Sequence, residues 1–154
     1  MEAKAAELLA AFKNPNLSVD SKVAYLASVK SDIKQKNVPE GAIRSIFETL
    51  RLAISSQHYS VLGAGFSTLG HLLKRLIIQE QQQWIVNQAQ NLYPTLLERL
   101  NDHKERIRAQ AASIFTELWP LAGNEVEYYV LDVALIGKNH RAKEMSMLWL
   151  ANVS

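Results

Sequence analysis

The sequence contains no cysteine, few prolines and glycines, and little surplus of either charge. The absence of cysteine excludes disulfides, thiolate nucleophiles and cysteine-ligated zinc or iron–sulfur sites, and it favours a reducing compartment. With 17 Lys and Arg against 15 Asp and Glu, the formal net charge is only +2, which is too small to predict nucleic-acid binding. Any electrostatic contact with a partner must therefore come from local clusters of charge.

The chain also lacks the signals of a secreted or membrane protein. Met1-Glu2-Ala3-Lys4 leads into an acidic amphipathic segment rather than into a cationic start and an apolar core. We expect no apolar run to reach the length that spans a bilayer. The sequence therefore predicts a soluble, uncleaved, intracellular chain that binds no membrane.

Apolar residues make up 48% of the 154 residues, enough to form the core of one domain. Their three-to-four spacing predicts helices throughout, and no strand-like alternation competes with it. A first helix ends at Asn14-Pro15-Asn16, and Ser18 caps a second whose Lys22, Lys30 and Lys34 are expected to face solvent.

The later helices follow the same pattern. Pro39 starts a third helix, and a long fourth helix is predicted over residues 59–78. The next pattern begins near Gln82 and contains Pro94, where a kink or a break is expected. A helix from Lys104 to Trp119 should end at Pro120 and Gly123, and a fourth pair of helices covers residues 126–149.

Polar turns recur within this pattern. Those centred near Asn16, His58, Asp102 and Asn139 follow one another after 42, 44 and 37 residues, close to the roughly 40 to 47 residues of HEAT and armadillo repeats. We therefore predict an all-α protein, an α-solenoid of about four HEAT-like hairpins in one domain, residues 1–154. The expected repeats are 2–36, 38–79, 82–120 and 124–153, and we expect the array to be truncated at its C-terminal end.

The sequence offers little for catalysis. Its four histidines are His58, His71, His103 and His140, and no His-Glu-x-x-His arrangement accompanies them. The glycine-rich run from Gly63 to Gly70 lacks the lysine of a Walker motif and the glycine spacing of a Rossmann motif, so tight helix packing is the better interpretation. We predict a non-enzymatic protein with no catalytic residues, no cofactor and no metal.

Two of the turns are rich in cations. Residues 137–143 carry three positive charges and no acid, and residues 102–108 carry three positive and two negative charges. Asp102 fits equally well as a helix cap or as a partner contact, and Arg108 fits equally well as a brace on the neighbouring repeat or as a partner contact. Cations near a helix N-terminus oppose the macrodipole, so an acidic partner is favoured for Lys104, Lys138 and Arg141. Aromatic residues do not interleave with these charges, which favours an acidic protein surface over nucleic acid.

Several segments resemble a known family. Residues 101–112, 137–147 and 29–39, with Phe66-Ser67-Thr68-Leu69-Gly70-His71 and Leu92-Tyr93-Pro94 in the same order, are similar to the N-terminus of fungal CLASP proteins. The resemblance covers the whole chain. It implies a TOG-type array of HEAT repeats in a microtubule-associated protein that stabilises dynamic microtubules and supports the mitotic spindle. Its implied locations are the cytoplasm, the cytoskeleton, the nucleus and the spindle.

The resemblance also implies how the array binds. TOG arrays bind tubulin through their inner turns and usually place a tryptophan in the first one, where this chain has Asn14-Pro15-Asn16-Leu17-Ser18. Two functions stay open: direct binding of tubulin, and an adaptor that docks a kinetochore or spindle protein. Because such arrays generally have six repeats, we also expect self-association through the C-terminal end. The candidate contact residues are Leu17, His58, His103, Lys104, Arg106, Lys138, Asn139, His140, Arg141 and Lys143.

Overall fold

The structure is a computed structural model that describes the backbone of residues 1–129 and the side chains of residues 1–121. Every regular element in this part of the chain is a helix, which confirms the predicted all-α class. The chain divides into two compact units, Met1–Gln88 and Ala89–Ser154. The helices are α1 Glu2–Lys13, α2 Val19–Gln35, α3 Glu40–Ile54, α4 Tyr59–Ile78, α5 Gln82–Ala89, α6 Tyr93–Leu100 and α7 Glu105–Tyr129.

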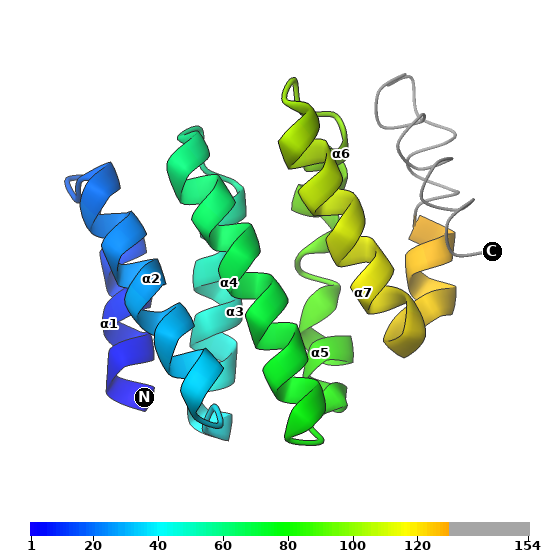
Figure 1. Ribbon diagram of the computed structural model, residues 1–154, viewed down its shortest axis with the longest axis horizontal. Helices are drawn as coiled ribbons and strands as arrows, with labels where there is room; N and C mark the ends of the chain where they lie inside the picture. The colour runs from blue at the N-terminus through cyan, green and yellow to red at the C-terminus, as the bar shows by residue number, and fades with distance from the viewer. Residues whose placement is uncertain (130–154) are drawn as a thin grey trace. The chain divides into compact units, whose positions relative to one another are not determined.

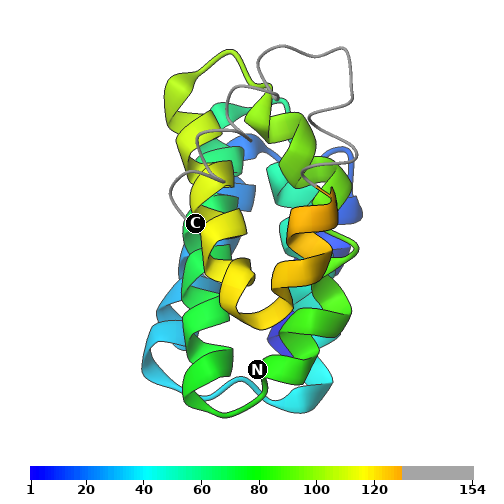
Figure 2. The same cartoon turned by 90° about the vertical axis from the view of Figure 1, so that its right-hand side faces the viewer.

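The first unit contains two helical hairpins, α1 with α2 and α3 with α4. The second helix of each hairpin packs against its counterpart, α2 on α4, and the first helices pack likewise, α1 on α3. Figures 1 and 2 show the resulting two layers. Two-layered stacking of hairpins is the HEAT-like architecture that the turn spacing predicts.

Local signals place the helix ends of this unit. The Ser18 hydroxyl accepts a hydrogen bond from the Ser21 amide at 3.1 Å, which confirms Ser18 as the cap of α2. Helix α4 has the predicted bounds. Lys30 differs from its expected place in solvent, because the residue is half-buried and its ammonium donates to the Ser67 hydroxyl of α4 at 3.2 Å. Lys22 lies over the ring of Phe12, 5.8 Å from its centre.

The apolar faces of the helices form the core of each unit. Side chains with almost no exposure include Leu8, Leu26, Ile33, Ile43, Ile46, Phe47, Leu50, Leu62, Leu69, Leu72, Phe115 and Leu118. Thr49 and Thr68 are also buried, and each donates to the carbonyl oxygen four residues earlier, Ser45 and Ala64, at 2.8 Å. These hydroxyls therefore cost little free energy to bury.

The glycines of α4 differ from one another in their surroundings. A Cβ on Gly65 would lie 2.8 Å from the Cβ of Ala53, so the predicted tight packing holds at this position. A Cβ on Gly63 or Gly70 would meet nothing within 4 Å in the described part of the chain. The prediction of tight packing is wrong for these two residues, because both lie on the outer side of the helix.

Helix α4 is also long and apolar enough to cross a membrane, judged by its length and composition only. The expectation that no apolar run reaches this length is therefore wrong. Half of this apolar stretch is buried inside the structure, and α4 packs on α2 and α3. A core helix passes the same test, because its apolar residues cover other helices instead of lipid.

The second unit shows how prolines act at different positions. The helical pattern breaks between Ala89 and Tyr93, with Pro94 in the first turn of α6, so the predicted break is confirmed. The prediction that Pro120 and Gly123 end the next helix is wrong, because α7 continues to Tyr129 with Pro120 inside it. Figure 1 shows α7 bending sharply in its C-terminal third, which is how a helix accommodates an internal proline. The rest of the predicted fourth pair lies outside the described residues.

Candidate functional site

The candidate contact sites are the inner turns, defined here as the turns that join α1 to α2, α3 to α4 and α6 to α7. They are residues 14–18, 55–58 and 101–104 in the described part of the chain. The first two lie at one edge of the first unit, opposite its other connections (Figure 1). The third belongs to the second unit. The predicted fourth turn, with Lys138, Asn139, His140, Arg141 and Lys143, lies outside the described residues.

The first inner turn is a compact polar loop. The side-chain oxygen of Asn14 accepts from the Asn16 amide at 3.0 Å, and the Leu17 amide donates to the Asn14 carbonyl at 3.3 Å. Leu17 itself is half-buried. The turn therefore presents a partly covered aliphatic side chain and no large aromatic one.

The second inner turn places His58 at the N-cap of α4. Its amide donates to the Ser56 hydroxyl at 3.1 Å, and its carbonyl accepts from the Leu62 amide at 3.0 Å. The helix start thus uses the backbone of His58, and the imidazole is exposed. Tyr59, the next residue, is 38% exposed. Tyr59 was expected only as the start of a helix, although an aromatic residue beside a polar turn is a signal that favours contact with a partner.

In the third inner turn a buried carboxylate holds the loop. Asp102 is 8% exposed, accepts from the Lys104 amide at 2.9 Å and pairs with the Arg99 guanidinium at 3.2 Å. Arg108 donates to the carbonyls of Asp102 and His103 at 2.8 and 3.0 Å. Asp102 and Arg108 thus both have structural roles within the protein. Arg108 braces its own turn, where the sequence suggested a neighbouring repeat.

The cations around this brace point to solvent. His103, Lys104 and Arg106 are exposed, and Arg106 lies in the first turn of α7. The positive end of the helix dipole makes this an unfavourable place for cations, offset in part by Glu105. The turn is therefore a rigid loop that presents positive charge, an arrangement suited to an acidic surface.

We also searched the described residues for metal-binding groups and for clustered histidines. No group of three or more histidines, aspartates and glutamates that could hold a metal ion occurs in the part of the chain that the structure describes. His58 and His103 belong to different inner turns, and His71 lies within α4. The described turns offer contact surfaces and hydrogen-bonding groups.

Comparison with known proteins gives a consistent result. The family model described as CLASP N terminal matches residues 1–154. Protein stu1 of Aspergillus fumigatus is 69% identical over 154 residues, all of this chain but 12% of that protein. Protein STU1 of Coccidioides immitis is 60% identical over 154 residues, again all of this chain and 12% of that protein. The chain thus spans about an eighth of the length of these relatives.

A solved structure agrees on the fold. The TOG domain of human Cep104 superposes with a TM-score of 0.77 at 17% sequence identity, covering 99% of this chain and 64% of that one. At this identity the likeness establishes the fold alone. The predicted HEAT-like architecture and the resemblance to fungal CLASP proteins are both confirmed.

Proposed function

The chain belongs to the CLASP N-terminal family, and from this membership we propose that it is a non-enzymatic scaffold module of a microtubule-associated protein. In this proposal its inner turns bind tubulin, and the whole protein stabilises dynamic microtubules and supports the mitotic spindle. The corresponding locations are the cytoskeleton and spindle, in the cytoplasm and nucleus. The module would consist of about four hairpins, at 2–36, 38–79, 82–120 and 124–153.

The third inner turn is the observation that carries the proposal. Asp102 and Arg108 hold the loop through internal contacts, so its shape does not depend on a partner. The exposed Lys104 and Arg106 then project from a preformed support. Preorganisation lowers the conformational entropy lost on binding, and exposed cations complement an acidic surface such as that of tubulin.

The proposal is tested by titrating the chain with purified tubulin dimer. The variant Lys104→Ala/Lys138→Ala/Arg141→Ala should bind about tenfold more weakly or worse than wild type, because three charges at the rim of an interface are worth roughly 0.5 kcal/mol or more each. The matched control Lys34→Ala/Lys36→Ala/Lys74→Ala removes the same charge from elsewhere and should bind like wild type. Affinity can be measured by analytical ultracentrifugation or fluorescence anisotropy.

Two outcomes would count against direct capture of tubulin. If neither wild type nor the turn variant binds the dimer, the chain does not hold tubulin by itself. If the turn variant and the control weaken binding equally, the attraction reflects total charge and does not involve the inner turns.

The first inner turn favours a second candidate function, an adaptor that docks a kinetochore or spindle protein without holding tubulin. Leu17 is half-buried there, so the turn supplies no large apolar anchor, the kind of residue that often dominates an interface. A photo-crosslinking residue at His103 in dividing fungal cells tests this reading. Capture of one kinetochore protein, lost in the Lys104→Ala/Arg106→Ala variant, supports the adaptor, and capture of tubulin alone counts against it.

A further inference from the structure

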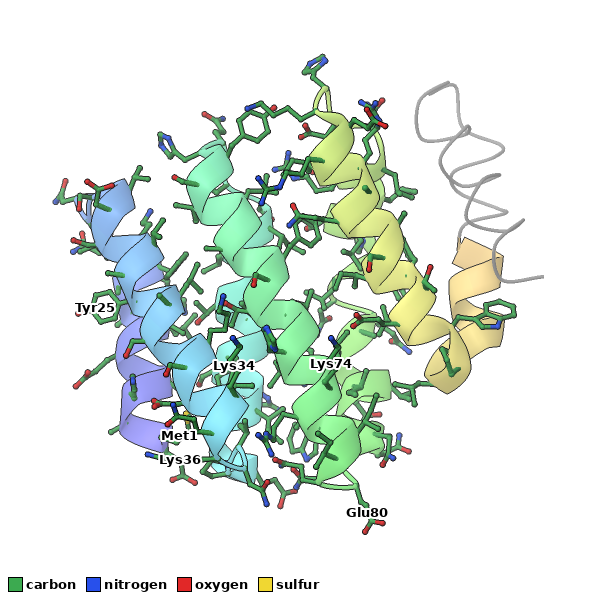
Figure 3. All side chains as sticks on the ribbon, in the orientation of Figure 1. Met1, Tyr25, Lys34, Lys36, Lys74 and Glu80 are labelled. Atoms are coloured by element: carbon green, nitrogen blue, oxygen red, sulfur yellow. The ribbon has the colours of Figure 1, made fainter. Side chains whose placement is uncertain are left out.

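The C-terminal halves of α2 and α4 form a second cationic surface, in the first unit. Lys30 and Lys34 lie one turn apart on the side of α2 that faces α4, and His71 and Lys74 lie on α4. The hydrogen bond from Lys30 to Ser67 fixes this register between the helices. Figure 3 shows Lys34 and Lys74 on neighbouring helices, on the side toward the viewer. We name these four residues the basic face.

The acidic side chains of α2 and α4 do not neutralise the basic face. Helix α4 contains no aspartate or glutamate along its whole length. Asp32 of α2 lies on the other side of its helix, where the Lys4 ammonium donates to it at 2.5 Å. Asp20 is at the opposite end of α2, about 15 Å from Lys30 at the usual rise per residue.

Helix capping explains only part of this charge. Arg75 donates to the Ile33 and Lys34 carbonyls at 2.7 and 2.6 Å, so it satisfies the C-terminal end of α2. The three lysines of the basic face come in addition to this capping arginine. Burial lowers the pKa of His71 most, and the positive charges of Lys34, Lys30 and Lys74 lower that pKa further. The three lysines therefore gather around one imidazole, and their mutual repulsion is a cost that a bound anion would remove.

We propose that the basic face binds an acidic, extended segment of a partner protein through Lys30, Lys34 and Lys74. The face runs about 10 Å along α4 from Ser67 to Lys74, which matches roughly three residues of extended chain. Exposed aromatic side chains lie elsewhere in this unit. Tyr25 is on the far side of α2 (Figure 3), and Tyr59 is at the other end of α4. The face thus lacks stacking platforms for nucleic-acid bases and favours carboxylates.

This surface is separate from the inner turns. In the first unit the inner turns lie at the start of α2 and α4, whereas the basic face occupies their C-terminal halves. Binding here neither requires nor follows from tubulin binding at the turns. The proposal therefore goes beyond the proposed function, and its test can fail independently.

The test uses the full chain and a fluorescently labelled synthetic peptide of glutamate and glycine, followed by fluorescence anisotropy at low salt. Lys34→Gln/Lys74→Gln should weaken binding about tenfold. Lys13→Gln/Arg44→Gln removes the same charge from exposed positions outside the basic face and the third inner turn, and it should stay within about twofold of wild type. A peptide with glutamine in place of glutamate is the ligand control, and circular dichroism establishes that each variant is folded.

A second readout reports on the site itself. NMR titration of the imidazole should show the pKa of His71 rising when the peptide is bound, since carboxylates near the ring favour its protonated form. The proposal is overturned if wild type does not bind the peptide, if both variants lose affinity equally, or if the pKa of His71 stays unchanged at saturation. It is also overturned if single-stranded oligothymidine binds more tightly with the same dependence on Lys34 and Lys74, which would make the face a nucleic-acid site.

Discussion

Two glycines of α4 show how strongly the effect of one residue depends on its neighbours. Gly65 and Gly70 occupy the same helix and cost it similar conformational entropy. A methyl group at Gly65 would press against Ala53, which cannot move without shifting α3, whereas a methyl group at Gly70 meets nothing within 4 Å. The first glycine is required by packing and the second is not.

The matched substitutions Gly65→Ala and Gly70→Ala should therefore change stability in opposite directions. Gly65→Ala should lower the free energy of unfolding by about 1–3 kcal/mol through overpacking. Gly70→Ala should raise it by about 0.5–1 kcal/mol, because alanine is the better helix former and costs less backbone entropy. Urea denaturation with a constant m-value measures both changes. Equal destabilisation by the two variants would mean that Gly70 is also packed.

At the scale of elements, the start of α7 depends on one carboxylate. Asp102, which is itself buried, accepts a hydrogen bond from the Lys104 amide and pairs with Arg99. Asp102→Ala should lower the free energy of unfolding by about 1–3 kcal/mol, because it leaves a donor and a cation without their acceptor. Asp102→Asn keeps an acceptor oxygen and should cost less. A thermal melt of the three proteins checks the order, and equal loss from both variants would assign the effect to the charge alone.

Prolines divide the helices in ways that depend on position. Pro94 is in the first turn of α6, where a missing amide donor costs nothing, so its effect was predictable from the pattern. Pro120 has more than a turn of α7 on either side, and the sequence signal for a helix end there was misleading. A helix can bend at proline and continue when its apolar residues still find cover, and local sequence does not report that cover.

At the scale of the whole molecule, the net charge is small and both proposed contact surfaces depend on local clusters. Raising the ionic strength from about 0.01 M to about 0.15 M shortens the Debye length from roughly 30 Å to roughly 8 Å. Binding of tubulin and of the glutamate peptide should each weaken several-fold over this range. The urea midpoint should change little, because the core is apolar. Affinity that does not respond to salt would indicate apolar contact in place of the proposed cations.

The sequence by itself determined the helical class, the bounds of α4 and the role of Ser18, because apolar period, helix breakers and caps act within one helix or turn. It also offered Asp102 as a helix cap, and the observed hydrogen bond from the Lys104 amide chose that alternative. Only the tertiary structure brought Lys34 and Lys74 to one face and separated the surroundings of Gly65 from those of Gly70. These pairings depend on the register between packed helices, which is set by interdigitating side chains and leaves no periodic trace in either helix.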